Sequence, residues 1–405
     1  MNILVAGSKG FVGRNLIENL KNIKDGKNRT RPGIIIRSIY EYDSKTDTVE
    51  YLGRCCSDCD FVFDLTGLSP KETEAGDKSR CFSSVLFDSL KRHGNRCCVV
   101  MPSVQNPSTC SEVLHPGFAD ESELTVLEYH IPHLVGKWVD SGYYSEVVEL
   151  CDAIANGRPF SVENRKKMVD LLFIDDFINE MFDALEGHPH RCDYLVQGSD
   201  SSDPTSQWDG VTPIPNEKGH YCYVPITHKA SLGTIVDYFE SFRRLNESFI
   251  IPEVPTGSLV YKLFSMFLSY LPEERMTYPL KMNIDERGTF TELLKTVNNG
   301  QVSINIARPG NVRGQHWHNT KWEIFIVVSG HALIQERKIG INPETGKEYQ
   351  IREFEVHGEE MKAVIMLPGY AHSIINLEND KDLVTVMWAN ESFDPEHPDT
   401  FREEV

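Results

Sequence analysis

The feature that most constrains this sequence is a glycine-rich turn at its start, between an apolar run and a helical pattern. Residues 2–6 read Asn-Ile-Leu-Val-Ala, which is typical of a buried parallel strand, and residues 14–20 space their apolar side chains as a helix does. Gly7, Gly10 and Gly13 lie between them in Gly-x-x-Gly-x-x-Gly spacing. They permit a tight turn, close approach to a pyrophosphate and close helix–strand packing, respectively. The pattern predicts a dinucleotide-binding unit.

The phosphate groups of such a cofactor would meet the backbone N–H groups where the helix begins. The next apolar run, Gly33-Ile-Ile-Ile-Arg37, is expected to be the second strand. Arg37 stands where NAD-binding folds usually carry an acidic residue, and an arginine there favours the extra phosphate of NADP. The predicted cofactor is therefore NADP, held by Gly7, Gly10, Phe11, Val12, Gly13 and Arg37.

Strand-like runs alternate with helical patterns through the rest of the N-terminal half. This alternation predicts a mostly parallel, doubly wound α/β sheet. The predicted strands are residues 60–67, 96–103 and 124–129, and the predicted helices include residues 83–92 and 147–155.

Length and composition set the outer limits. The 405 residues exceed one compact core, so we expect two domains, residues 1–275 and 281–405. A formal charge of −19 argues against nucleic-acid binding. We find no apolar run of membrane-spanning length and no signal peptide pattern, so the predicted location is cytoplasmic, with no membrane partner. The ten cysteines all lie between Cys55 and Cys222 and are expected to be reduced thiols.

A second cluster of motifs, in the C-terminal half, carries potential metal ligands. His316 and His318 alternate in an expected strand and so share one face, with Glu323 five residues on and His372 after a Pro-Gly turn. Three imidazoles and a carboxylate suit zinc, or another divalent metal such as iron or manganese, with a position left open for substrate. The alternatives are acid/base groups without a metal, or ordinary polar residues at strand ends.

The surroundings of these residues are short β-branched runs separated by Gly, Pro and Asn turns, which predict an all-β domain. The runs are residues 301–306, 323–328, 332–334, 363–367 and 383–388. Together with the spacing of residues 314–330 and 368–376, they resemble the two conserved motifs of cupins, which are double-stranded β-barrels.

The whole chain resembles one family. The glycine spacing, the Asp-Leu-Thr-Gly run ending at Gly67 and residues 172–176 resemble extended short-chain dehydrogenase/reductases. Such a half followed by a cupin resembles the CapF/WbjC family of bifunctional UDP-sugar enzymes of capsule and O-antigen precursor synthesis. The match extends through the junction and the C-terminal half, at residues 268–272, 278–280, 283–292 and 393–401.

The resemblance implies a Rossmann-like α/β domain followed by a cupin, a homodimer and a UDP-sugar substrate. The cupin half would epimerise C3 of a UDP-2-acetamido-2,6-dideoxy-4-keto-hexose, and the N-terminal half would then reduce its C4 ketone with NADPH. His316 matches the base of deoxysugar epimerases, and His318 is the other proton-transfer candidate. Glu323 and His372 would hold the metal or orient the pocket, and Ser103 would be the reductase hydroxyl.

The sequence departs from the family at the reductase site. Family members carry Asn-Pro-Tyr-x-x-x-Lys, whereas this chain has Asn106-Pro107-Ser108 and then Glu112 at the lysine position. This departure leaves three interpretations. In the first, the chain is an epimerase whose reductase-like half binds nucleotide, forms a dimer interface or shields the product. Alternatively, it is a non-catalytic sugar-nucleotide-binding or scaffolding partner of a complete reductase. A third interpretation is reduction by other residues.

Overall fold

The computed structural model forms two compact units, and their limits differ from the predicted ones. The first unit comprises Met1–Glu240 and Pro255–Pro272, and the second comprises Ser241–Val254 and Glu273–Val405. Residues 241–254, predicted to belong to the first domain, group with the second because β12 (Ile250–Ile251) pairs with β14 (Gly288–Thr296). The structure describes residues 1–68, 77–104, 124–139, 145–195, 212–298 and 300–405.

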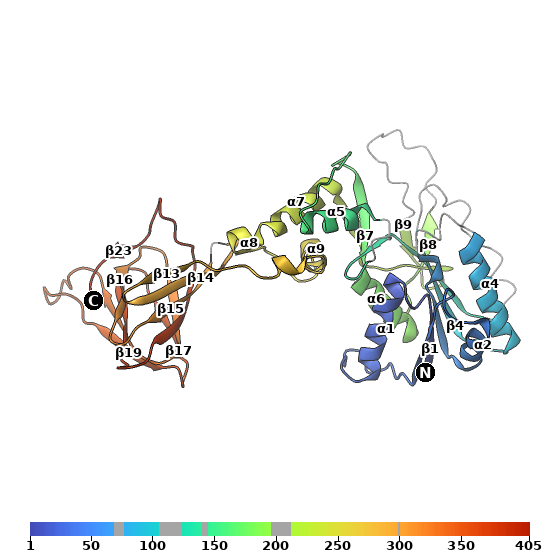
Figure 1. The fold of residues 1–405 in the computed structure, drawn as a ribbon, viewed down its shortest axis with the longest axis horizontal. Helices are drawn as coiled ribbons and strands as arrows, with labels where there is room; N and C mark the ends of the chain where they lie inside the picture. The colour runs from blue at the N-terminus through green and yellow to red at the C-terminus, as the bar shows by residue number, and fades with distance from the viewer. Residues whose placement is uncertain (69–76, 105–123, 140–144, 196–211, 299) are drawn as a thin grey trace. The chain divides into compact units, whose positions relative to one another are not determined.

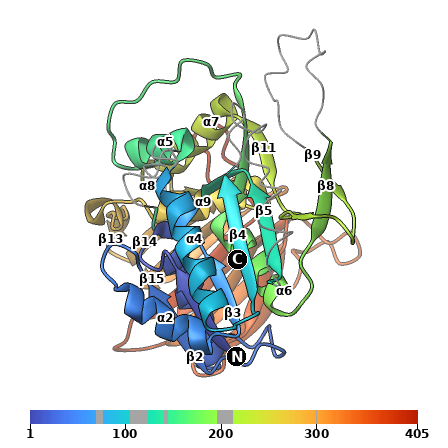
Figure 2. The same cartoon turned by 90° about the vertical axis from the view of Figure 1, so that its right-hand side faces the viewer.

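The first unit is built on an eight-stranded sheet with helices on both faces (Figures 1 and 2). Helices α1 (Phe11–Lys24) and α6 (Ile174–Leu185) cover one face, and α2 (Val49–Asp58) and α4 (Asp77–Arg92) cover the other. The predicted mixed α/β organisation is therefore confirmed. In sheet order the strands are β2 (Ser38–Tyr42), β1 (Asn2–Ala6), β3 (Phe61–Asp64), β4 (Cys98–Val104), β5 (Val126–Ile131), β10 (Tyr221–Cys222), β8 (Arg191–Leu195) and β9 (Thr212–Pro215).

The strand order positions the glycine turn. Strands β2, β1, β3, β4 and β5 are parallel, and the direction in which strands are added reverses between β1 and β3. Open α/β sheets bind ligands outside the carboxyl ends of the strands at such a reversal. Beside this sheet lie a three-stranded sheet and three more helices: β6 (His133–Val135), β7 (Met168–Phe173), β11 (His228–Ser231), α5 (Glu146–Ala155), α7 (Leu232–Arg243) and α9 (Leu259–Leu268).

The second strand is not where the apolar run predicts it. Strand β2 comprises Ser38–Tyr42, and its pairing with β1 begins at Ser38 opposite Asn2. The predicted segment, residues 33–37, precedes the strand and lies at the amino end of the sheet, where Arg37 N donates to Met1 O. The prediction was wrong because the segment is apolar for another reason: Ile34 and Ile36 are buried in the core without joining the sheet.

The second unit consists of two sheets that enclose one apolar core. Phe325 and Leu383 from one sheet and Ile334 and Ile374 from the other belong to the same cluster of buried residues. This unit is β-rich, as predicted. One sheet contains β12, β13 (Met282–Asp285), β14, β15 (Gln301–Ala307), β22 (Leu383–Ala389), β17 (Glu323–Ser329) and β20 (Ala363–Met366). The other contains β19 (Arg352–His357), β18 (His331–Lys338), β21 (Tyr370–Asn376), β16 (Val312–Trp317) and β23 (Phe401–Arg402).

None of the helices within the described ranges is long and apolar enough to cross a membrane.

Candidate active site

A β-bulge shapes the backbone that carries the first two histidines. Strand β16 pairs with β21, and the register shifts between Gly314 and His316, where Gln315 has a φ of 64°. Gly314 itself has a φ of +88°, and a Cβ there would lie 2.7 Å from the carbonyl oxygen of His372. Only glycine fits this position. The bulge brings His316 opposite His372 in the sheet.

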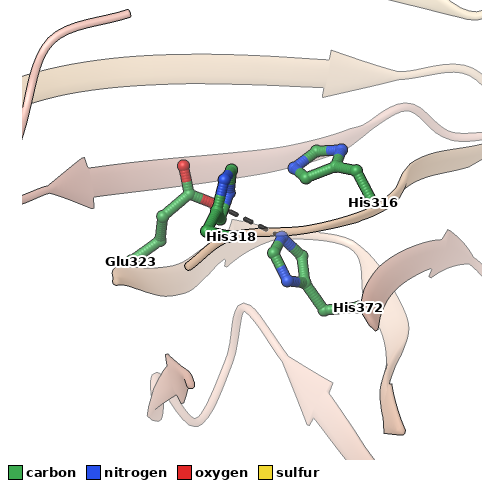
Figure 3. A group of neighbouring side chains, drawn as sticks. All are labelled: His316, His318, Glu323 and His372. Atoms are coloured by element: carbon green, nitrogen blue, oxygen red, sulfur yellow. Dashed lines mark ion pairs between the residues drawn. The ribbon is translucent and has the colours of Figure 1, made fainter. Parts of the chain in front are cut away.

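The structure brings all four predicted metal-site residues together (Figure 3). His316 lies near the end of β16 and His318 directly follows that strand, His372 comes from β21, and Glu323 begins β17 in the facing sheet. The ring centroids lie 4.9 Å apart for His316 and His318, and 4.6 Å apart for His316 and His372. One ligand atom from each residue lies within 4.8 Å of the others. The group therefore lies between the two sheets of the second unit.

Three atoms of this group are buried without a hydrogen bond. They are Nε2 of His318, Oε2 of Glu323 and Nε2 of His372, and no described residue supplies a partner to any of them. Glu323 Oε2 lies 3.4 Å from His372 Nε2 and 3.8 Å from His318 Nε2, so the three atoms converge. Leaving a buried polar atom unpaired costs free energy, and a cation between these atoms would remove that cost. The residues present therefore fit a divalent metal ion.

The outer contacts of His318 support the same assignment. Its Nδ1 lies within hydrogen-bond reach of the carbonyl oxygen of Asp399, to which it would donate. A proton on Nδ1 leaves the Nε2 lone pair directed toward Glu323, and metal-binding histidines usually have this arrangement. The carboxylate of Asp399 also accepts the backbone N–H groups of residues 319–321, so it fixes the turn between His318 and Glu323.

Electrostatics keep the cluster in the protonation state that a metal requires. Burial, together with the neighbouring His372 and His318, lowers the pKa of His316 to about 4. Burial alone would raise the pKa of Glu323, but the close approach of His318 and His372 and the charge of Lys321, with Nζ at 3.3 Å, hold that pKa well below its usual value. At neutral pH the group offers a neutral imidazole at His316 beside an ionised carboxylate.

Sequence reasoning missed Glu336, a second buried carboxylate in the second unit. This β18 residue is 1% exposed and lies directly opposite His372 in the sheet. Its Oε1 accepts the backbone N–H of Leu367 at 3.0 Å, which fixes the turn before His372, and burial raises the pKa of its carboxyl group. The alternation of β18 was the available signal, because it places Glu336 on the same face as the buried Ala332 and Ile334.

A pocket of about 320 Å³ shares Lys321 with this site. It offers both charged and aromatic groups to a ligand. Its lining includes Lys321, Phe393, Asp394, His397, Asp399 and Thr400.

In the first unit, the glycine turn is as tightly packed as its spacing predicts. Gly7 has a φ of +77°, and a Cβ there would lie 3.1 Å from the carbonyl carbon of Leu65 at the end of β3. A Cβ on Gly13 would lie 2.2 Å from the carbonyl oxygen of Gly7. Gly10 is the residue before α1, which begins with Phe11 and Val12, and because glycine has no side chain it forms no side-chain cap. The turn thus leaves the end of α1 open to a ligand.

Arg37, predicted to bind the cofactor, lies at the wrong end of the sheet. Its Nε donates to Asn2 Oδ1 at 2.9 Å, and its guanidinium pairs with Asp58. Asp43 directly follows β2 at its carboxyl end. The preceding residue, Tyr42, accepts the N–H groups of Gly7 and Ser8 through its carbonyl oxygen, so Asp43 lies beside the glycine turn. The side chain beside the turn is therefore acidic, and the prediction for Arg37 was wrong because it followed from the misplaced strand.

The remaining reductase residues are only partly described. Ser103 lies near the carboxyl end of β4, with Oγ 3.5 Å from the carbonyl oxygen of Tyr129. Ser108 and Glu112 lie outside the described residues. Tyr129 does not replace the missing tyrosine, because its side chain is fully buried and its hydroxyl donates to Glu180 Oε1 at 2.7 Å.

Comparisons with known proteins agree on one family. Residues 283–401 match the model of the polysaccharide biosynthesis C-terminal domain. The chain is 30% identical over 414 residues to a UDP-2-acetamido-2,6-beta-L-arabino-hexul-4-ose reductase of Pseudomonas aeruginosa, covering 99% of this chain and 98% of that protein. Its structure matches that of the capsular polysaccharide assembling protein CapF of Staphylococcus aureus with a TM-score of 0.79, at 32% identity and over 100% of both chains. The chain therefore belongs to the CapF-type family of nucleotide-sugar enzymes in polysaccharide biosynthesis.

Proposed function

We propose that the second unit is a cupin that epimerises C3 of a UDP-2-acetamido-2,6-dideoxy-4-keto-hexose. The observation that carries this proposal is the convergence of three unpaired buried atoms, from His318, Glu323 and His372, beside the imidazole of His316. Such a site combines a divalent metal, zinc in our proposal, with a neutral base. The Pseudomonas relative, a UDP-2-acetamido-2,6-beta-L-arabino-hexul-4-ose reductase, is named for a 4-keto sugar nucleotide of the same class.

The chemistry of the substrate suits these residues. A C4 ketone acidifies the proton on C3, so a positioned base can remove that proton and an acid can return one to the opposite face. His316 is neutral at neutral pH and is the group we assign to proton removal. His318, Glu323 and His372 would hold the metal, which when bound would stabilise negative charge on the C4 oxygen. Asp399 and Glu336 would keep His318 and His372 oriented.

The first unit, in our proposal, is a Rossmann-like domain that binds a dinucleotide but reduces its substrate poorly. The turn from Gly7 to Gly13 provides the close approach that a pyrophosphate needs. Ser108 and Glu112 replace the family's proton donor and its lysine. Without them, a 4-keto product would have to be reduced by a complete reductase acting after this protein. We further propose that the protein acts as a homodimer.

The test is proton exchange without reduction. The purified chain, loaded with zinc, is incubated in D₂O with the UDP-linked 4-keto-6-deoxy-aminosugar and no dinucleotide, and NMR follows deuterium at C3. We expect exchange at C3, and its loss on His316→Ala. The matched control is His220→Ala, an exposed histidine in the first unit.

Absence of exchange in the zinc-loaded wild-type chain would reject the epimerase. The protein would then be a non-catalytic sugar-nucleotide-binding partner of a complete reductase, the alternative that the altered reductase motif favours. Binding of the UDP-sugar, measured by calorimetry on the same sample, distinguishes that outcome from a protein that does not bind the sugar.

A further inference from the structure

The outer surface of the second unit carries another group of metal-ligating side chains, at the edge of the five-stranded sheet. His331 is the first residue of β18, and it lies directly opposite His357, the last residue of the edge strand β19. Glu355 precedes His357 by two residues and so shares its face of the strand. One ligand atom from each of the three lies within 4.8 Å of the others.

This group is separate from the site inside the barrel. Side chains alternate along β18: Ala332, Ile334 and Glu336 are buried on the inner face, where Glu336 meets His372. His331 has the opposite orientation and faces outward with Glu355 and His357. The two groups therefore cannot share one ion, and this inference does not rest on the proposed epimerase.

The backbone holds the three side chains close together. His331 Nε2 lies 2.7 Å from Glu355 Oε1, and the rings of His331 and His357 stack with centroids 4.1 Å apart. The residues next to this pair are also hydrogen-bonded, since Gly358 N donates to Gly330 O at 2.9 Å. The backbone therefore continues to hold the two strands together beyond His331 and His357. Only side-chain rotations are needed to direct the three donors at one point.

The donor set determines what the group would bind. Two imidazoles and one carboxylate, on a surface where water can complete the coordination, suit zinc and similar first-row divalent ions more than calcium or magnesium. A second group with such donors, Glu180, Asp183 and His190, is a weaker candidate because Glu180 already accepts hydrogen bonds from Tyr129 and from the backbone of His190.

We propose that His331, Glu355 and His357 form a second zinc site, on the outside of the barrel. A zinc ion bound there would link the edge strand β19 to β18. An edge strand pairs on one side only, so a metal bridge to its neighbour protects it from opening. Because the Glu355 side chain is 61% exposed, this outer site should bind zinc more weakly than the buried one.

The experiment counts zinc ions bound to the full chain. Equilibrium dialysis against buffered free zinc, with metal and protein both quantified, should show the inner site filling first and one further ion binding at higher zinc. His357→Ala should lose that further ion, and Glu355→Gln, which keeps the shape of the side chain, should weaken its binding at least about tenfold. His220→Ala, an exposed histidine in the first unit, is the matched control and should bind as wild type does.

Two results would overturn the proposal. One is a wild-type chain that binds no ion beyond the inner one, and the other is a further ion retained by both His357→Ala and Glu355→Gln. A crystal of the wild-type chain in zinc, measured at the zinc absorption edge, gives an independent readout. An anomalous peak between the three side chains is expected, and its absence under saturating zinc counts against the site.

Discussion

Removing the metal should destabilise the second unit by an amount that the structure allows us to work out. Three buried atoms, on His318, Glu323 and His372, have no hydrogen-bond partner among the described residues. Each such atom costs about 1–3 kcal/mol, so the metal-free site carries a penalty of about 3–9 kcal/mol. An ion present at about 1,000 times its Kd stabilises the fold by about 4 kcal/mol, which lies inside that range.

The assay follows thermal unfolding of the second unit within the full chain, with free zinc buffered at about 1,000 times the Kd of the inner site, and again after chelation. For a unit of this size, 1 kcal/mol corresponds to about 2–4 °C, so chelation should lower Tm by about 8–16 °C. His318→Ala should abolish the zinc-dependent difference. His331→Ala, in the outer group, should keep most of it, because this change leaves the inner site intact. Equal Tm values for the zinc-loaded and chelated wild-type protein would refute the argument from unpaired atoms.

Three further predictions test other parts of the argument. Because burial lowers the pKa of His316 to about 4, the unfolded chain binds more protons than the folded one between about pH 4 and pH 6.5. Stability of the chelated protein should therefore rise with pH across that window, and His316→Gln should flatten the slope measured by urea titration. Gly13→Ala should destabilise the first unit by at least about 2 kcal/mol, because the new Cβ would collide with a backbone oxygen. Gly53→Ala in helix α2 is the control and should not destabilise the unit, and calorimetry measures the stability of both variants. Because of the carboxylate of Asp43, the chain should bind NADH at least about tenfold more tightly than NADPH in fluorescence titrations. Asp43→Ala should reduce this difference in affinity, and Arg37→Ala should leave it unchanged.

The features that could be predicted from sequence are local ones. The turn at Gly7 needs no partner to be recognised, because its backbone conformation and the close packing at Gly13 exclude any side chain. The pair His316 and His318 is also visible, since strand alternation brings both side chains to one face. These two motifs act over a few residues, where steric rules apply without tertiary context, whereas Glu323 and His372 join the pair only through the pairing and packing of distant strands.

Tertiary pairing decided the rest. The run of isoleucines before Arg37 is apolar enough for a strand, but the strand begins only at Ser38, which pairs with Asn2. This register places Asp43, and not Arg37, beside the glycine turn. Only the fold shows that Glu336 lies opposite His372 and that His331 meets His357 on the outside of the same sheet. Sequence determines which residues can share a face, whereas the register between distant strands depends on the free energy of the whole packed core, which no local pattern contains.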